Sequence, residues 1–332
     1  KYPAITEDAL VRSFFGEAEI PPDAMSVSDK LARMKDILDD ARAYCDQLVD
    51  FRVVYEEMQI SKAFYSKTRD LSQSYAISSA NALAVVGKDG SIKYEYDGVS
   101  GQMGAESLDK LRPMVKTIVD HALELLTAER LEPGEYDVIC NPVVAGLIAH
   151  EAFGHGVETD MFVKNRAKGT EYMGKYVASK ITNMHDGAIG AKNVASYLFD
   201  DEGTLGSDTV VIENGILASG ISDLLSSLQL GIRATGNGRR ESFERKAYAR
   251  MTNTYFAPGH DALEDMIASI KFGYLLENYH SGMEDPKNWG IQCVIARGRE
   301  IKDGKLTGKV VSPVMMTGYV PFDGETPVAV AL

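Results

Sequence analysis

The regular pattern of the chain begins with an amphipathic helix. Apolar residues recur at steps of three or four, a spacing that places them on one helical face; they are Leu31, Met34, Leu38, Ala41, Cys45 and Leu48. Ser26 and Asp29 precede this stripe with the S-x-x-D spacing of a capping box. We therefore expect a helix that starts near residue 26 and turns one apolar face to a core.

Residues 51–96 carry a β pattern. Short β-rich segments lie at 52–56, 62–65 and 74–77, and segments 82–86 and 92–96 flank the hairpin signal Gly87-Lys88-Asp89-Gly90. This region predicts an antiparallel sheet. A second long helix is expected from about residue 105 to 128, where Pro113 marks either a kink or the true first turn.

The second half of the chain mixes a few helices with short strands. A strand at 136–140 precedes Asn141-Pro142, a strong helix opening. Further strands are expected at 210–212, 292–296 and 309–311, with hairpin turns at 214–215 and 302–305 and a helix near 261–270. Because helices and hairpins alternate without βαβ regularity, we predict an α+β fold of antiparallel sheets with long flanking helices and a β-rich C-terminal part. We divide it into domains 1–135 and 136–332.

The helix that opens at Asn141 runs into two histidines and a carboxylate, His150, Glu151 and His155. Neutral imidazole is a common zinc ligand, and an adjacent carboxylate can take a proton from metal-bound water. On a regular α-helix, residues five apart point about 140° away from each other. Gly154 and Gly156 bracket His155 and favour a π-type extra residue or a helix end, either of which would swing His155 back towards His150.

A simpler interpretation makes the two histidines capping groups and Glu151 a solvated charge. Against it, the helix that leads into the motif is apolar all round, so we expect His150 and Glu151 to be carried into the interior. Buried imidazoles and carboxylates without partners are costly, and a metal is the simplest partner.

Composition narrows the function classes. The 332 residues are 45% apolar and carry a net charge of −13, which disfavours direct binding to nucleic acid. Three widely separated cysteines indicate a reducing compartment, so we expect a cytoplasmic protein.

The apolar run 143–149 is far shorter than the roughly 20 residues of a membrane span. The chain does not begin with Met, and we expect it to be a piece of a longer or processed protein.

Five ordered blocks carry a family resemblance: HEAFGHGVETD at 150–160, DDEGT at 200–204, IENGIL at 212–217, GNGRRES at 236–242 and RMTNTY at 250–255. In these blocks the sequence resembles the TldD/PmbA family, known as modulators of DNA gyrase and understood as metallopeptidases. The resemblance covers roughly residues 50–320. It favours the TldD side, because PmbA-type partners generally lack the metal motif.

The resemblance implies a zinc peptidase that acts on small or unfolded peptides inside the cavity of a dimer. By this resemblance His150 and His155 are zinc ligands and Glu151 is the catalytic general base. The expected assembly is a homodimer or a heterodimer with a PmbA-like subunit. The rival hypothesis is a non-catalytic subunit that binds peptides for an active partner, and a weaker one is a gyrase-associated regulator.

One departure from the family concerns the third zinc ligand, a cysteine in a Gly-rich segment near the C-terminus. This chain has no such cysteine, and its tail 322–332 does not match the family. Cys140 and Cys293 lie in strand-like apolar runs that favour a structural role. Either the segment has been cut away, or it is disordered and missing from the chain, or this member has lost its metal.

Two polar motifs remain. The acidic run Asp200-Asp201-Glu202 favours either a structural turn or hydrogen bonding to peptide backbone near the site, because a hard-cation site needs six or more oxygens. Arg239 and Arg240 lack the pattern of a phosphate loop. They either pair with local acids or bind a peptide carboxylate, and we assign them as candidate substrate-binding residues.

Overall fold

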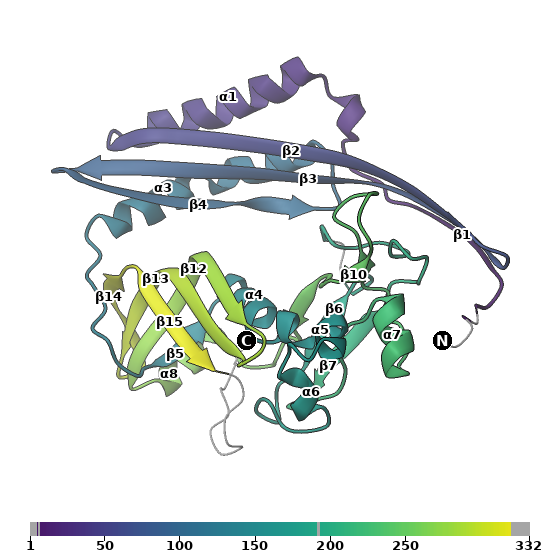
Figure 1. Cartoon of the computed structure of the whole chain (residues 1–332). Coiled ribbons are helices and arrows are strands. Elements are labelled where there is room, and N and C mark those ends of the chain that lie inside the picture. The colour runs from purple at the N-terminus through teal and green to yellow at the C-terminus, as the bar shows by residue number, and fades with distance from the viewer. Residues whose placement is uncertain (1–4, 6, 191–192, 320–332) are drawn as a thin grey trace. The chain divides into compact units, whose positions relative to one another are not determined.

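The computed structural model describes residues 5, 7–190 and 193–319. The tail 322–332, which departs from the family, lies outside this range. The chain divides into two compact units. The N-terminal unit contains residues 8–128 with 193–195, and the C-terminal unit contains 129–190 and 196–319 together with residues 5 and 7 (Figure 1). No helix within the described ranges is long and apolar enough to cross a bilayer.

The N-terminal unit is built on one long strand, β3 (Arg69–Lys88). The antiparallel strand β2 (Leu48–Tyr65) pairs along one edge of β3. The other edge pairs first with the parallel strand β1 (Leu10–Phe15) and then with the antiparallel strand β4 (Ser91–Gly101). The predicted hairpin turn is confirmed at Asp89 and Gly90, both at positive φ. The predicted short strands are wrong in length, because they are parts of these continuous strands.

Helices of the N-terminal unit supply its core. Ser26 caps α1 (Val27–Tyr44) by accepting the backbone N–H of Asp29, as predicted. The predicted apolar stripe is wrong at Leu31, which is 58% exposed. The buried face instead includes Lys30, whose ammonium group donates to Glu57.

The second predicted helix is interrupted where Pro113 lacks a backbone N–H. It forms α2 (Glu106–Leu111), a 3-10 turn (Arg112–Met114) and α3 (Val115–Leu125). One face of α3 packs in a core with residues of α1, α2, β2 and β3. Pro113 thus separates two helices instead of kinking one.

The larger sheet of the C-terminal unit contains β12 (Phe272–Asp285) and β13 (Gly290–Lys302), paired antiparallel. The short strand β5 (Asp137–Cys140) adds to β12 in parallel. Two further strands, β14 (Lys305–Val311) and β15 (Val314–Tyr319), pair with β13 in succession. The predicted turn between β13 and β14 is confirmed.

A second, smaller sheet has the order β11-β6-β7-β8 and is antiparallel throughout. Its strands are β6 (Met184–Gly187), β7 (Asp208–Glu213), β8 (Ile216–Leu217) and β11 (Thr254–Phe256). A two-stranded ribbon joins β9 (Gly238–Arg239) to β10 (Tyr248–Ala249).

The helices of the C-terminal unit are short: α4 (Pro142–Ile148), α5 (Thr159–Val163), α6 (Gly169–Tyr172), α7 (Leu224–Leu230) and α8 (Leu263–Ser269). The last matches the helix expected near 261–270. Residues of both sheets and of the segment after α4 share one core, which includes Phe153, Ile212 and Trp289. The architecture confirms the predicted α+β class with a β-rich C-terminal part.

Candidate metal centre

The histidine motif lies where α4 changes its helical period. Asn141 caps the helix by accepting the backbone N–H of Val144 at 2.9 Å, and Pro142 occupies its first turn, as predicted. The chain then forms a π-helix at Ala149–Gly154, in which the backbone N–H of His155 donates to the carbonyl of His150. A 3-10 turn, His155–Val157, follows. The π-type distortion expected before His155 is therefore confirmed.

The π-helix brings the two imidazoles together. The Nε2 atoms of His150 and His155 are 3.1 Å apart, and the rings meet edge to face at 4.7 Å between centroids. Both glycines of the motif are required by close packing. A Cβ on Gly154 would lie 2.0 Å from Sδ of Met251, and one on Gly156 would lie 2.6 Å from Nε1 of Trp289.

His150, Glu151 and His155 form the group that could hold a metal within the described part of the chain, with ligand atoms all within 4.8 Å of one another. Two nitrogens bound to one tetrahedral zinc lie about 3.3 Å apart, close to the observed separation. Oε2 of Glu151 is buried without a hydrogen-bond partner among these residues, which suits a carboxylate that faces a water or substrate. The geometry fits zinc, although catalytic zinc commonly has three protein ligands.

The two histidines have different surroundings. His150 is exposed, which corrects the expectation that it is carried into the interior. Partial loss of hydration around its ring and the neighbouring His155 still lower its pKa. Burial also opposes the charged form of His155, but Glu158, whose Oε1 lies 3.5 Å from Nδ1, raises its pKa overall. Because the Glu158 carboxylate interacts with Nδ1 of His155, the other ring nitrogen, Nε2, is left to face Nε2 of His150.

Glu151 is buried, as expected, and faces strand β12. Burial and the nearby Glu284 raise its pKa. Gly282 makes room for it, because a Cβ at that position would lie 2.2 Å from Oε1 of Glu151. Sequence reasoning missed both Gly282 and Glu284, since nothing in the local pattern of β12 indicates that the strand reaches residue 151.

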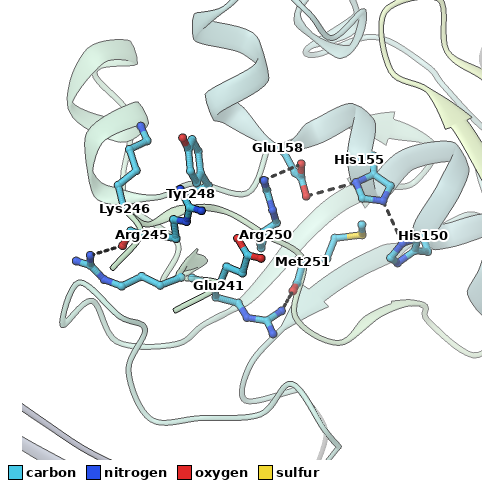
Figure 2. A pocket seen from close by; sticks show the side chains of 11 residues that line it. His150, His155, Glu158, Glu241, Arg245, Lys246, Tyr248, Arg250 and Met251 are labelled. Carbon is cyan, nitrogen blue, oxygen red and sulfur yellow. Dashed lines mark hydrogen bonds and ion pairs between the residues drawn. The ribbon is translucent and has the colours of Figure 1, made fainter. Parts of the chain in front are cut away.

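A pocket of about 500 Å³ opens beside the two histidines (Figure 2). We call it the basic pocket. Its lining includes Glu158, Glu241, Tyr248 and five cationic side chains, namely Arg239, Arg240, Arg245, Lys246 and Arg250. The structure thus places both predicted arginines in one pocket with the histidines. Sequence reasoning missed Arg245 and Lys246, which lie between two of the family blocks, and it assigned no role to Arg250, which begins the block 250–255.

The acidic run supports the wall of this pocket. Asp200 accepts backbone N–H groups of Glu202, Thr204 and Gly238, and Asp201 accepts that of Arg240. Burial raises the pKa of Asp200 to about 7 despite these hydrogen bonds. The run therefore forms a structural turn, as predicted.

The cysteines do not complete the metal site. Cys140 lies in β5 and Cys293 in β13, and neither belongs to the histidine group. Burial raises the pKa of Cys140 to about 12 and that of Cys293 to about 11. Because zinc binds thiolate, these environments do not favour the form that a ligand needs.

Comparison with known proteins gives a consistent result. The family model described as the PmbA/TldA metallopeptidase C-terminal domain matches residues 133–322. A metalloprotease from Methanothermobacter thermautotrophicus is 28% identical over 90% of this chain and 66% of its own length. A zinc metalloprotease TldD homolog from Saccharolobus solfataricus is 30% identical over 76% of this chain and 57% of its own.

The chain therefore spans less than two thirds of the first of these relatives and a smaller part of the second. Among solved structures, TldE from Thermococcus kodakarensis has the same fold. It aligns with a TM-score of 0.75 and 20% identity, over 96% of this chain and 71% of that one.

Proposed function

The chain belongs to the TldD/PmbA metallopeptidase family, and from this premise we propose that it is a zinc-dependent peptidase that hydrolyses small or unfolded peptides. The observation that carries the proposal is the cluster of His150, Glu151 and His155 around one point, produced by a π-helix. A motif of capping groups alone would not require its two imidazole Nε2 atoms to lie 3.1 Å apart.

In this proposal His150 and His155 hold zinc through Nε2, and Glu158 fixes the ring of His155 from its other side. Zinc, when bound, supplies Lewis acidity and lowers the pKa of water. Glu151 takes the proton of the attacking water and returns it to the leaving amine. Its raised pKa suits a group that must both accept and donate a proton near neutral pH.

The basic pocket is proposed to hold the peptide, with Arg239 and Arg240 as binding residues. We also propose a cytoplasmic protein that works as a homodimer or with a PmbA-like subunit, without direct contact to nucleic acid or membrane. The name and fold of the TldE structure support the PmbA-like partner, and the net charge of −13 disfavours nucleic acid.

The substitution Glu151→Gln tests the mechanism. It removes the base but keeps the size of the side chain, so peptide cleavage by the full-length protein should fall at least about a hundredfold, the lower range of general-base effects. The exposed Glu213→Gln in β7 is the matched control. Cleavage of an unstructured peptide at the normal rate by the Glu151 variant would contradict the mechanism.

A second candidate is a non-catalytic subunit that binds peptides for an active partner. It is favoured by one observation, that only two imidazoles and no thiol belong to the described metal group. Elemental analysis of the full-length protein separates the two candidates. One zinc per chain supports the peptidase, and a metal-free protein that still binds peptides supports the partner subunit.

A further inference from the structure

The charge of the basic pocket is opposite to that of the whole chain. The protein carries a net charge of −13, yet five cationic side chains and two carboxylates line this pocket. One pair is internal, because Nη1 of Arg250 lies 3.3 Å from Oε2 of Glu158. Apart from this pair, the lining contains four cations and one carboxylate. The carboxylate is that of Glu241, and the cations are Arg239, Arg240, Arg245 and Lys246.

These four cations form no ion pair with any residue that the structure describes. The Nη1 atoms of Arg239 and Arg240 donate to the backbone carbonyls of Met251 and Arg245, at 2.6 and 2.8 Å. A carbonyl orients a guanidinium group without neutralising it, and several of its five N–H donors stay available. Lys246 lies over the ring of Tyr248, 4.3 Å from the centroid.

Two nearby acids accept hydrogen bonds from the backbone, and the charge of Glu202 also interacts with those of Arg240 and Lys246. Asp201 accepts the backbone N–H of Arg240 at 2.8 Å, and Glu202 accepts that of Leu224 at 2.7 Å. These bonds fix the backbone that carries the arginines. In Figure 2, His150 and His155 lie at one end of the view and Arg245 and Lys246 at the other, with Glu158 and Arg250 between them. An anion bound by the cations therefore lies in the same pocket as the histidines.

We propose that the basic pocket binds a carboxylate of the peptide substrate and so raises the affinity for peptides that present one there. This inference rests on the proposed function, which gives the pocket a peptide to bind. A planar guanidinium group matches a carboxylate with two parallel hydrogen bonds. The carboxylate comes either from the C-terminus of the peptide or from a Glu or Asp side chain. Nucleic-acid phosphate is disfavoured, because the rest of this acidic chain would repel a polyanion.

A binding experiment with the full-length Glu151→Gln protein tests the proposal without turnover. The probes are four rhodamine-labelled heptapeptides that share one sequence, with Glu or Gln as the penultimate residue and a free acid or an amide at the C-terminus. We expect the peptide with both carboxylates to bind at least about tenfold more tightly than the neutral one. The two intermediate peptides identify which carboxylate is bound.

The double variant Arg245→Gln/Lys246→Gln, made in the same protein, should remove most of this preference. The matched control Lys302→Gln/Lys305→Gln removes the same charge from the β13–β14 turn and should keep the preference. Raising the salt concentration should weaken the preference, because these side chains are exposed.

Equal affinity for all four peptides would overturn the proposal, as would a preference that persists in the Arg245/Lys246 variant. It would also be wrong if a single-stranded oligonucleotide bound more tightly than any peptide and lost binding in that variant. Failure of the proposed function is seen separately. Zinc-loaded protein that cleaves no peptide but keeps the preference refutes the peptidase, whereas cleavage without preference refutes only the carboxylate pocket.

Discussion

Glycine at position 282 leaves the space that the Glu151 carboxylate occupies. A Cβ there would lie 2.2 Å from Oε1 and 2.8 Å from Cγ of Glu151. We expect Gly282→Ala to displace the carboxylate and lower kcat by about a hundredfold, since small misplacements of a catalytic group have effects of that size. Steady-state kinetics measures the change.

The control for this substitution is Gly318→Ala in β15, where a Cβ meets no atom within 4 Å. Both variants should show the far-UV circular dichroism of the wild type. An unchanged kcat for Gly282→Ala would contradict the assignment of Glu151 as the base.

Glu158 is a positioning residue for His155. Its Oε1 lies 3.5 Å from Nδ1 of His155, and its Oε2 lies 3.3 Å from Arg250. Glu158→Gln should lower zinc affinity by about 10- to 100-fold, the usual effect of losing a carboxylate behind a histidine ligand. Competition with a chromogenic chelator measures this affinity. The exposed Glu171→Gln should leave it unchanged, and the same result for Glu158→Gln would refute the positioning role.

Local signals predicted residues whose partners are near in sequence. Ser26 and Asn141 were recognisable as helix caps because the side-chain oxygen of each accepts the backbone N–H of the residue three positions later. Gly154 marked the π-helix because glycine is the usual residue where a helix unwinds or ends. Glu284 and Arg245 carried no such signal, since their relation to the histidines exists only after distant strands have packed.

At the scale of elements, β12 and β13 are joined by a charge cluster. Arg297 and Arg299 both donate from Nε to Oε2 of Glu277, at 2.8 and 2.7 Å, and Arg297 is buried. Burial by itself would raise the pKa of Glu277, but the two arginines outweigh it and hold the pKa below its ordinary value. The ionised carboxylate therefore stabilises the folded sheet.

We expect Glu277→Gln to lower the free energy of unfolding by about 3 kcal/mol at pH 7, because it leaves the buried Arg297 without this carboxylate. Because the pKa of Glu277 is lowered by folding, its carboxylate stabilises the protein fully at any pH above the pKa of the unfolded chain. This stabilisation is lost as pH falls through the lower pKa of the folded protein. The difference between wild type and variant should therefore shrink as pH falls below the ordinary glutamate value of about 4.3 and vanish once the carboxyl of the folded protein is protonated. Urea unfolding across pH measures both curves, with Glu213→Gln as control; parallel curves would contradict the assignment.

The lengths of strands were harder to predict than their existence. Strand β2 alternates exposed and half-buried residues over most of its 18 residues, so its apolar signal breaks into short segments. Pairing along β3 joins these segments into one strand. In α1, the predicted stripe included Leu31, but the helix is rotated so that Lys30 reaches Glu57.

At the scale of the whole molecule, the single tryptophan reports on one unit. Trp289 is 1% exposed in the core of the C-terminal unit, and its indole abuts Gly156 next to the histidines. Zinc at a hundredfold excess over its dissociation constant should stabilise the folded state by about 2.7 kcal/mol. The thermal midpoint seen by tryptophan fluorescence should then rise by about 5–10 °C.

A chelator should reverse this rise, and the variant His150→Ala/His155→Ala should show none. A midpoint in the wild type that is indifferent to zinc would refute the metal centre. The domain division after residue 135 stays a prediction, and limited proteolysis around residues 127–135 would test it.

The π-helix at Ala149–Gly154 also bears on how such centres arise and are recognised. One additional amino acid in a helical turn can be absorbed by a wider coil, so an insertion between two histidines need not separate their rings. The number of residues between two such histidines can therefore change during evolution while their rings still reach the same position in the folded protein. Sequence motifs that fix the number of residues between the two histidines will miss proteins of this kind. Such motifs should allow one more residue where a glycine directly precedes the second histidine.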